Sequence, residues 1–205
     1  MYVPAAFSLD DDAAWAVVRD AGAGMLIRVT SSGLGSVFVP VVSDHERNVL
    51  TSHVARANSW WRDASDGEDV LALFVAASAY VSPSYYPSRM EKPGVVPTWN
   101  YVAAEVHAKL YVHDDVEWLR AQVRTVTNSF EEHRSPRWSV DDAPEDFLNH
   151  QLRAIVGLEM RVTSIEGKAK LSQNRPEMDH DNVARELARR GLAEQNVAVR
   201  MPVAD

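Results

Sequence analysis

The feature that most constrains the fold of this chain is a strictly alternating run from Val102 to Val112. Its apolar positions recur at every second residue: Val102, Ala104, Val106, Ala108, Leu110 and Val112. Polar or amphipathic side chains stand between them: Glu105, His107, Lys109 and Tyr111. Because successive side chains of a strand point to opposite faces, this run predicts a strand with one buried and one solvated face. Strands of this kind are typical of antiparallel sheets.

Shorter segments of strand character lie on both sides of this run. We expect strands at Met25–Thr30, Ser36–Val42, Val49–Ala55, Val70–Ala76 and Leu158–Ile165. Helical spacing and capping residues predict four helices: Asp10–Asp20 before Gly22, a helix capped by Asp114 and Asp115 that runs to Phe130, a helix from Pro144 to Gly157, and a surface helix at Asp181–Arg190. Short, punctuated strands with a few peripheral helices predict an α+β fold that is mainly antiparallel β, a barrel in preference to other α+β sheets.

The bulk composition limits the domain count and the function classes. At 205 residues with 46% apolar side chains, we expect one domain over residues 1–205, with a helical tail from about residue 177. The net charge of −8 provides no global basic field for nucleic acid. The absence of cysteine excludes disulfides, thiolate metal sites and cysteine nucleophiles.

Location and metal binding can also be addressed from the sequence. The N-terminus lacks the charged start and apolar core of a signal peptide, and the longest apolar run, Val70 to Val81, is too short to span a bilayer. We therefore expect a cytoplasmic protein without a membrane partner. His107 and His113 lie six residues apart, but no third ligand accompanies them, so no metal site is predicted.

A pair of lysines near the C-terminal end is the first candidate binding site. Read as an extended strand, the segment from Ile165 to Arg175 places Lys168, Lys170, Ser172 and Asn174 on one face. Two neighbouring ammonium groups repel each other unless an anion or a carboxylate lies between them. The segment therefore predicts an anion site, with an ordinary surface strand as the alternative.

Three further blocks combine polar side chains with aromatic rings. Thr51–Arg62 ends a strand in a cluster of hydrogen-bond donors beside Trp60 and Trp61, which suits a polar aromatic ligand or, equally, a surface turn over core tryptophans. Tyr80–Pro87 is expected to be a stiff extended loop that displays its tyrosines, or a rigid connector whose rings pack locally. Val96–Tyr101 offers a hydroxyl, an amide and ring faces, or is an edge strand built around Trp99.

Taken together, these blocks resemble the PaiB-type FMN-binding negative transcriptional regulators. The residues that carry the resemblance occur in the family's order: Met1-Tyr2-Val3-Pro4 with Phe7, His53-Val54-Ala55-Arg56-Ala57-Asn58, Tyr80-Val81-Ser82-Pro83-Ser84 with Tyr86, Val96-Pro97-Thr98-Trp99-Asn100-Tyr101, and Glu166-Gly167-Lys168 with Lys170-Leu171-Ser172-Gln173-Asn174-Arg175. The chain departs from the family's usual residues at Ser59, Tyr85, Ala108 and Ala169.

The resemblance implies an FMN-binding split β-barrel related to the pyridoxamine-phosphate oxidases, and a homodimer with FMN at the subunit interface. It further implies that FMN is bound by the motif residues Ser52, His53, Arg56, Asn58, Thr98, Trp99, Asn100, Lys168, Lys170, Ser172 and Gln173. No residue stands out as a dedicated acid, base or nucleophile, and in flavoenzymes the cofactor carries the difficult chemistry.

Two classes of function follow from the resemblance. The first is an FMN-binding regulator of transcription. The family name implies DNA binding. The acidic net charge and the lack of a helix-turn-helix do not support direct DNA binding. The second is an FMN-dependent oxidoreductase or flavin reductase of the pyridoxamine-phosphate-oxidase-like superfamily. A split-barrel dimer that has lost its cofactor is a third possibility.

Overall fold

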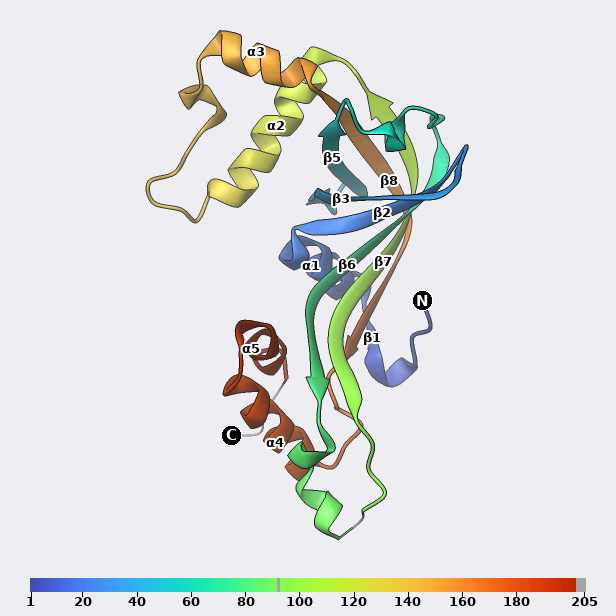
Figure 1. The fold of residues 1–205 in the computed structure, drawn as a ribbon, viewed down its shortest axis with the longest axis vertical. Coiled ribbons are helices and arrows are strands. Elements are labelled where there is room, and N and C mark those ends of the chain that lie inside the picture. Colours follow the sequence, from blue (N-terminus) through green and yellow to red (C-terminus); the bar gives the residue numbers. More distant parts are fainter. Residues whose placement is uncertain (92, 202–205) are drawn as a thin grey trace. The chain divides into compact units, whose positions relative to one another are not determined.

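The structure is a computed structural model that describes residues 1–91 and 93–201 (Figure 1). Its strands are β1 (Ser8–Leu9), β2 (Ala23–Thr30), β3 (Gly33–Pro40), β4 (Val42–Asp44), β5 (Val49–Ala55), β6 (Glu68–Val81), β7 (Thr98–His113) and β8 (Ile155–Lys170). Its helices are α1 (Asp11–Ala21), α2 (Val116–Glu131), α3 (Glu145–Arg153), α4 (Glu177–Ala188) and α5 (Leu192–Ala198). The strand order is β3-β2-β6-β7-β8-β5-β4, and β1 pairs with β8.

The contacts divide the chain into two compact units. Unit 1 comprises Met1–Ala21, Phe74–Glu105 and the described part of the segment that begins at Glu166. Unit 2 comprises Gly22–Leu73 and Val106–Ile165. The long strands β6, β7 and β8 each contribute a segment to both units.

Unit 2 contains the hairpin of β2 and β3, which pair antiparallel from Ala23↔Pro40 to Thr30↔Gly33. β5 pairs antiparallel with β8 over seven residues, from Val49↔Arg161 to Ala55↔Ile155. The apolar positions of the alternating run in β7 are buried from Val102 to Leu110, as the sequence predicts. One face of β7 is therefore held against the core by apolar side chains.

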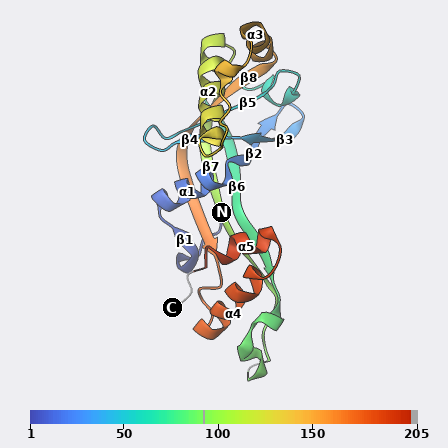
Figure 2. The ribbon, with the colours of Figure 1, turned by 90° about the vertical axis from the view of Figure 1, so that its left-hand side faces the viewer.

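The helices of unit 2 lie side by side in both views (Figures 1 and 2). α2 begins where the Oδ1 atom of Asp115 accepts a hydrogen bond from the amide of Trp118 at 2.9 Å, which is an N-cap interaction. α2, α3 and the short 3-10 helix at Val140–Asp142 share one apolar cluster: Leu119, Val140, Leu148 and Leu152. This cluster anchors the two helices to each other.

Unit 1 contains α1 and the C-terminal pair α4 and α5, which pack together (Figures 1 and 2). α4 buries Val183, Ala184 and Leu187 on one face. Its carboxylate Asp179 is also buried, and it accepts hydrogen bonds from the amide (3.0 Å) and the hydroxyl (2.6 Å) of Ser88. The tail is therefore a packed part of unit 1, not the surface helix that the sequence suggests.

Three other sequence expectations are also corrected by the structure. The helix predicted from Pro144 to Gly157 ends at Arg153, and Gly157 belongs to β8. Of the two alternatives for Tyr80–Pro87, the extended loop that displays its tyrosines is wrong. The segment folds into the 3-10 helices Pro83–Tyr85 and Pro87–Met90 and buries Tyr85 and Tyr86, as expected of a connector whose rings pack locally. A proline at the first helical position leaves no unsatisfied amide, so such short turns are compatible with both prolines. Third, the strand alternation expected through Ser172 and Asn174 ends at Lys170, the last residue of β8.

None of the described helices is long and apolar enough to cross a membrane.

Candidate functional site

Lys170 is the last residue of β8 and the centre of a basic cluster in unit 1. Its Nζ atom donates hydrogen bonds to the hydroxyl of Thr98 and, at 2.7 Å, to the carbonyl oxygen of Trp99. Burial lowers the pKa of the Lys170 ammonium below its usual value, and the charges of Lys168 and Arg175 lower it further. A bound anion would offset both effects.

Lys168 and Arg175 complete this basic cluster. The Nζ atom of buried Lys168 donates to the carbonyl oxygen of Tyr2 at 2.9 Å and lies 5.3 Å from the ring centroid of Tyr101. The guanidinium of Arg175 lies 4.7 Å over the ring of Tyr86. Within residues 1–91 and 93–201, no carboxylate forms an ion pair with Lys168, Lys170 or Arg175. The cluster therefore keeps its positive charge available for a ligand.

The predicted alternation of the lysine segment ends at Lys170. Ser172 has a φ of 65°, in the left-handed region, so the chain turns there and Ser172 and Asn174 leave the strand face. The buried hydroxyl of Ser172 lies 3.0 Å from Nδ2 and 3.1 Å from Oδ1 of buried Asn100. Gln173 holds the same turn through the amide of Leu171 and the carbonyl of Ala169. These side chains fix the backbone that carries Lys170.

An aromatic surface accompanies the basic cluster. The Trp99 side chain is 51% exposed, and its ring lies 6.2 Å from the ring of half-exposed Tyr80 at an interplanar angle of 60°. Large exposed rings are costly in water unless a ligand or a partner covers them. The Lys170 ammonium contacts the backbone carbonyl of Trp99, and the Trp99 ring itself packs with Tyr80.

The remaining predicted residues lie in unit 2, where each has a partner of its own. The buried hydroxyl of Ser52 donates to the Pro40 carbonyl at 2.7 Å. Asn58 accepts a hydrogen bond from the Trp60 amide at 2.9 Å and so caps the 3-10 helix at Ser59–Trp61. The structure gives both side chains a folding role; their contact with FMN stays a prediction.

Arg56 anchors the strand end that it follows. Its guanidinium pairs with both carboxylate oxygens of Asp114 and donates to the carbonyl oxygens of Arg153 at 2.8 Å and Ile155 at 3.1 Å. Hydrogen bonds from Arg56 lower the pKa of the Asp114 carboxyl. Most of the N–H donors of Arg56 are therefore used within unit 2, and its contact with FMN also stays a prediction.

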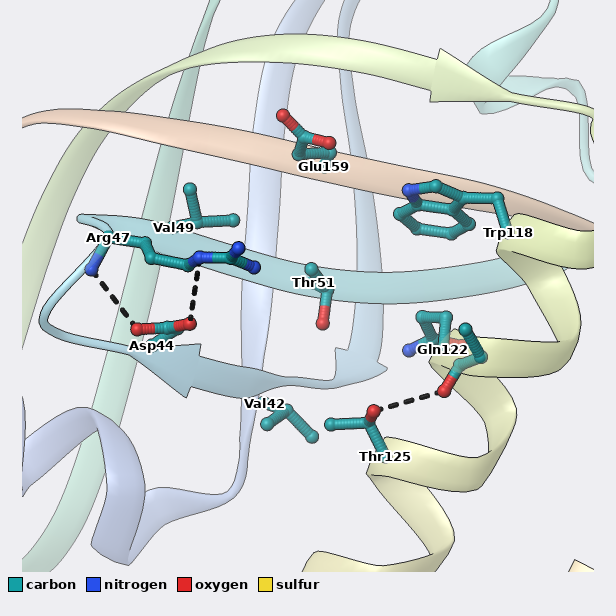
Figure 3. Close-up of a pocket in the computed structure, with 10 residues that line it drawn as sticks. Val42, Asp44, Arg47, Val49, Thr51, Trp118, Gln122, Thr125 and Glu159 are labelled. Atoms are coloured by element: carbon teal, nitrogen blue, oxygen red, sulfur yellow. Dashed lines mark hydrogen bonds and ion pairs between the residues drawn. The ribbon is translucent and has the colours of Figure 1, made fainter.

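His53 leads to a cavity that the sequence analysis missed. Its Nδ1 atom lies 2.9 Å from Oε1 of Gln122, a buried amide on α2. Gln122 lines a cavity of about 430 Å³ between α2 and the strands β4, β5 and β8 (Figure 3). The other lining residues are Val42, Asp44, Arg47, Val49, Thr51, Trp118, Ala121, Thr125 and Glu159. The sequence does contain one sign of this site. Gln122 is a polar residue on the otherwise apolar buried face of α2, between Leu119 and Val126.

The structure therefore brings some predicted site residues together and leaves others separate. In unit 1, Thr98, Trp99 and Lys170 are in direct contact, and Asn100 contacts Ser172. In unit 2, the four predicted residues hold separate structural positions. Among the described residues, no three histidine, aspartate or glutamate side chains gather in a way that could hold a metal ion.

Comparisons with known proteins show which family the chain belongs to. Residues 1–164 match the family described as "Putative FMN-binding domain". The protein named "Protease synthase and sporulation protein PAI 2" of Bacillus subtilis (strain 168) is 31% identical over 192 residues, which cover 91% of this chain and 89% of that relative. The match to the Bacillus subtilis protein covers most of the chain. The family match ends at residue 164, before Lys168 and Lys170.

Solved structures show the same fold at low sequence identity. The FAD and heme binding protein from Mycobacterium smegmatis superposes with a TM-score of 0.58 at 13% identity, over 80% of this chain and 73% of that one. The flavocytochrome Anf3 from Azotobacter vinelandii superposes with a TM-score of 0.58 at 8% identity, over 78% and 67% of the two chains. The predicted α+β split barrel is confirmed. The chain belongs to the PaiB-type family of FMN-binding proteins.

Proposed function

We propose that this protein binds FMN as a homodimer and acts as a flavin-dependent regulator of the PaiB type. The observation that carries the proposal is the basic cluster of unit 1, in which Lys168, Lys170 and Arg175 lie together without a carboxylate partner among the described residues. The family to which the chain belongs is described by FMN binding.

The donor set fits the chemistry of FMN. The phosphate is a dianion near neutral pH, and the Lys170 ammonium with the Thr98 hydroxyl would hold it by charge-assisted hydrogen bonds. Lys168 and Arg175 would strengthen the local positive field. The exposed Trp99 and Tyr80 rings suit the flat isoalloxazine. When bound, the flavin supplies electron or hydride transfer, while the chain supplies binding and orientation.

The proposed dimer has support in the exposed apolar side chains. Val29, Leu34 and Phe38, on the β2–β3 hairpin of unit 2, are each more than two-thirds exposed. A second copy of the chain would cover such a patch. Sedimentation equilibrium tests the dimer: a monomer at micromolar concentration, with and without FMN, would count against it.

The regulatory role rests on the relative in Bacillus subtilis, whose name refers to protease synthesis and sporulation. The net charge of −8 argues that regulation acts through a partner or a metabolite rather than through direct contact with DNA. A gel-shift experiment with the protein's own promoter region at low salt tests this directly. A specific shift would replace the indirect mechanism with direct repression.

An FMN-dependent oxidoreductase is the second candidate, favoured by the same positive charge. Cationic groups beside a flavin stabilise its reduced, anionic form. Absorbance spectra distinguish the candidates: bound flavin that is bleached rapidly by NADH or NADPH indicates the enzyme, and inert flavin indicates the regulator. A protein that neither binds nor quenches added FMN would contradict both.

A further inference from the structure

The cavity beside α2 in unit 2 has the size and walls of a small-molecule site. Its volume of about 430 Å³ lies within the usual range for such sites, roughly 300–1,000 Å³. Val42, Val49 and Ala121 provide apolar surface, and the indole of Trp118 stacks on His113 with ring centroids 4.1 Å apart. Because the ring is stacked on His113, its position in the cavity wall is fixed.

Gln122 presents an unsatisfied polar group at this cavity. The side chain is 5% exposed; its Oε1 atom contacts His53, and its Nε2 atom is buried without a hydrogen-bond partner among the described residues. Figure 3 shows the amide nitrogen pointing from α2 into the space in front of Thr51. A buried polar atom without a partner costs roughly 1–3 kcal/mol. A ligand that hydrogen-bonds to this amide would remove that cost.

Gln122 presents either a free donor or a free acceptor to the cavity, depending on the orientation of its amide. If His53 donates through Nδ1, the free atom of Gln122 is the N–H donor; if His53 accepts, the amide is turned and its oxygen is free. A carboxamide on the ligand satisfies either orientation, because it carries a carbonyl oxygen and N–H groups. The Thr51 hydroxyl, which has no hydrogen bond within the described chain, is a second polar contact.

The carboxylates around the cavity each have a basic neighbour. Asp44 accepts from the amide of Arg47 at 3.1 Å and lies 3.9 Å from its guanidinium nitrogen Nε. Glu159 contacts His113 at 3.0 Å and Arg161 at 2.7 Å. A phosphate or an ammonium group would therefore have to compete with these partners for the charged side chains. The cavity differs in this respect from the basic cluster of unit 1.

We propose that this cavity is a second binding site, specific for a neutral, planar ring compound that carries a carboxamide. The ring lies against Trp118 and the valines, and the carboxamide pairs with Gln122. All of its lining residues belong to unit 2 and none of them is among the predicted FMN contacts, although Gln122 contacts one of these, His53.

Benzamide is the probe, with benzoate and benzylamine as charged probes of the same ring. Proton–nitrogen correlation spectra of the flavin-free protein follow the side-chain NH₂ signals of Gln122, which are identified by their loss in Gln122→Met. We expect benzamide to shift these signals and to saturate the site in the millimolar range. Both charged probes should bind at least about fivefold more weakly, because each loses about one hydrogen bond's worth of binding free energy. Equal affinity for benzoate, or no shift at the solubility limit, overturns the proposal.

Matched variants separate the site from general effects on folding. Gln122→Met should weaken benzamide about fivefold, whereas Gln151→Met, the same change at an exposed position of α3, should leave the affinity unchanged. Ala121→Phe adds a ring at an exposed position of α2 that borders the cavity, and it should abolish binding without unfolding the protein. Folded variants that still bind benzamide with wild-type affinity would contradict the assignment.

Discussion

The Lys170 ammonium donates a hydrogen bond to the carbonyl oxygen of Trp99 at 2.7 Å, which ties the end of β8 to the start of β7. The contact places a partly buried positive charge next to the backbone of an exposed indole. Its second partner is the hydroxyl of Thr98, which is neutral, so the charge is not compensated by a carboxylate. An ammonium without a carboxylate partner is what the phosphate of FMN needs from its site.

The pH dependence of FMN binding should report the lowered pKa of Lys170. Burial and the neighbouring cations place this pKa below the usual 10.5, and the phosphate binds the protonated form. As pH rises from about 7 through the lowered pKa, the ammonium is lost, so the affinity should fall. Lys170→Arg stays charged and should bind FMN with a flatter profile over the same range. Parallel profiles for the two proteins would exclude Lys170 as the titrating group.

Gly157 should be intolerant of any side chain. A Cβ atom at Gly157 would lie 2.1 Å from Cζ3 of Trp118, and moving the indole would disturb its stacking on His113. We expect Gly157→Ala to lower the free energy of unfolding in urea by about 2 kcal/mol.

The matched control for that substitution is Gly94→Ala. An added Cβ atom at Gly94 meets no atom within 4 Å, so the change should stay within about 0.5 kcal/mol. If the two variants are equally stable, the close packing of Trp118 on β8 is wrong.

Asp63 should make stability depend on pH in the acidic range. Hydrogen bonds from Ser31, and then from buried Arg28, hold the pKa of the Asp63 carboxyl well below its usual value of 3.8. A depressed pKa in the folded state stabilises the protein above the unfolded pKa of about 4, and this contribution is lost as the pH falls toward the folded value. Asp63→Asn should therefore lower Tm at neutral pH, and the difference from wild type should narrow below pH of about 4.

The control for Asp63 is the exposed carboxylate Asp69, which pairs with Lys109 at 2.8 Å. Its side chain is 89% exposed, so solvent screens the pair and Asp69→Asn should leave Tm almost unchanged. A Tm difference for Asp63→Asn that is the same at pH values of about 3 and 7 would show that its carboxylate charge contributes nothing.

Regular local patterns were sufficient to predict much of the fold. The alternation around Val102 identified β7, and β5 has the bounds Val49–Ala55 that the sequence predicts. Asp115 caps α2 as expected. These elements are predictable because periodicity and capping depend on neighbouring residues only.

Features that depend on distant partners were not predictable. Tyr85 is buried because α4 packs over it: Asn182 donates to its carbonyl oxygen, and Arg190 lies 5.1 Å over its ring. The turn at Ser172 likewise depends on Asn100, which is 72 residues away in the chain. The cavity beside Gln122 requires the packing of α2 on β5, which no local pattern specifies.

The central claim is that the basic cluster at the end of β8 binds FMN. Titration of the protein with FMN, followed by quenching of flavin fluorescence, tests it most directly when wild type is compared with Lys170→Ala and Lys109→Ala. Lys109 is the matched control, because it is a β7 lysine whose charge is already paired with Asp69. We predict about tenfold weaker binding for Lys170→Ala and unchanged affinity for Lys109→Ala. Equal affinities for the two variants, or no quenching by the wild-type protein, would contradict the account.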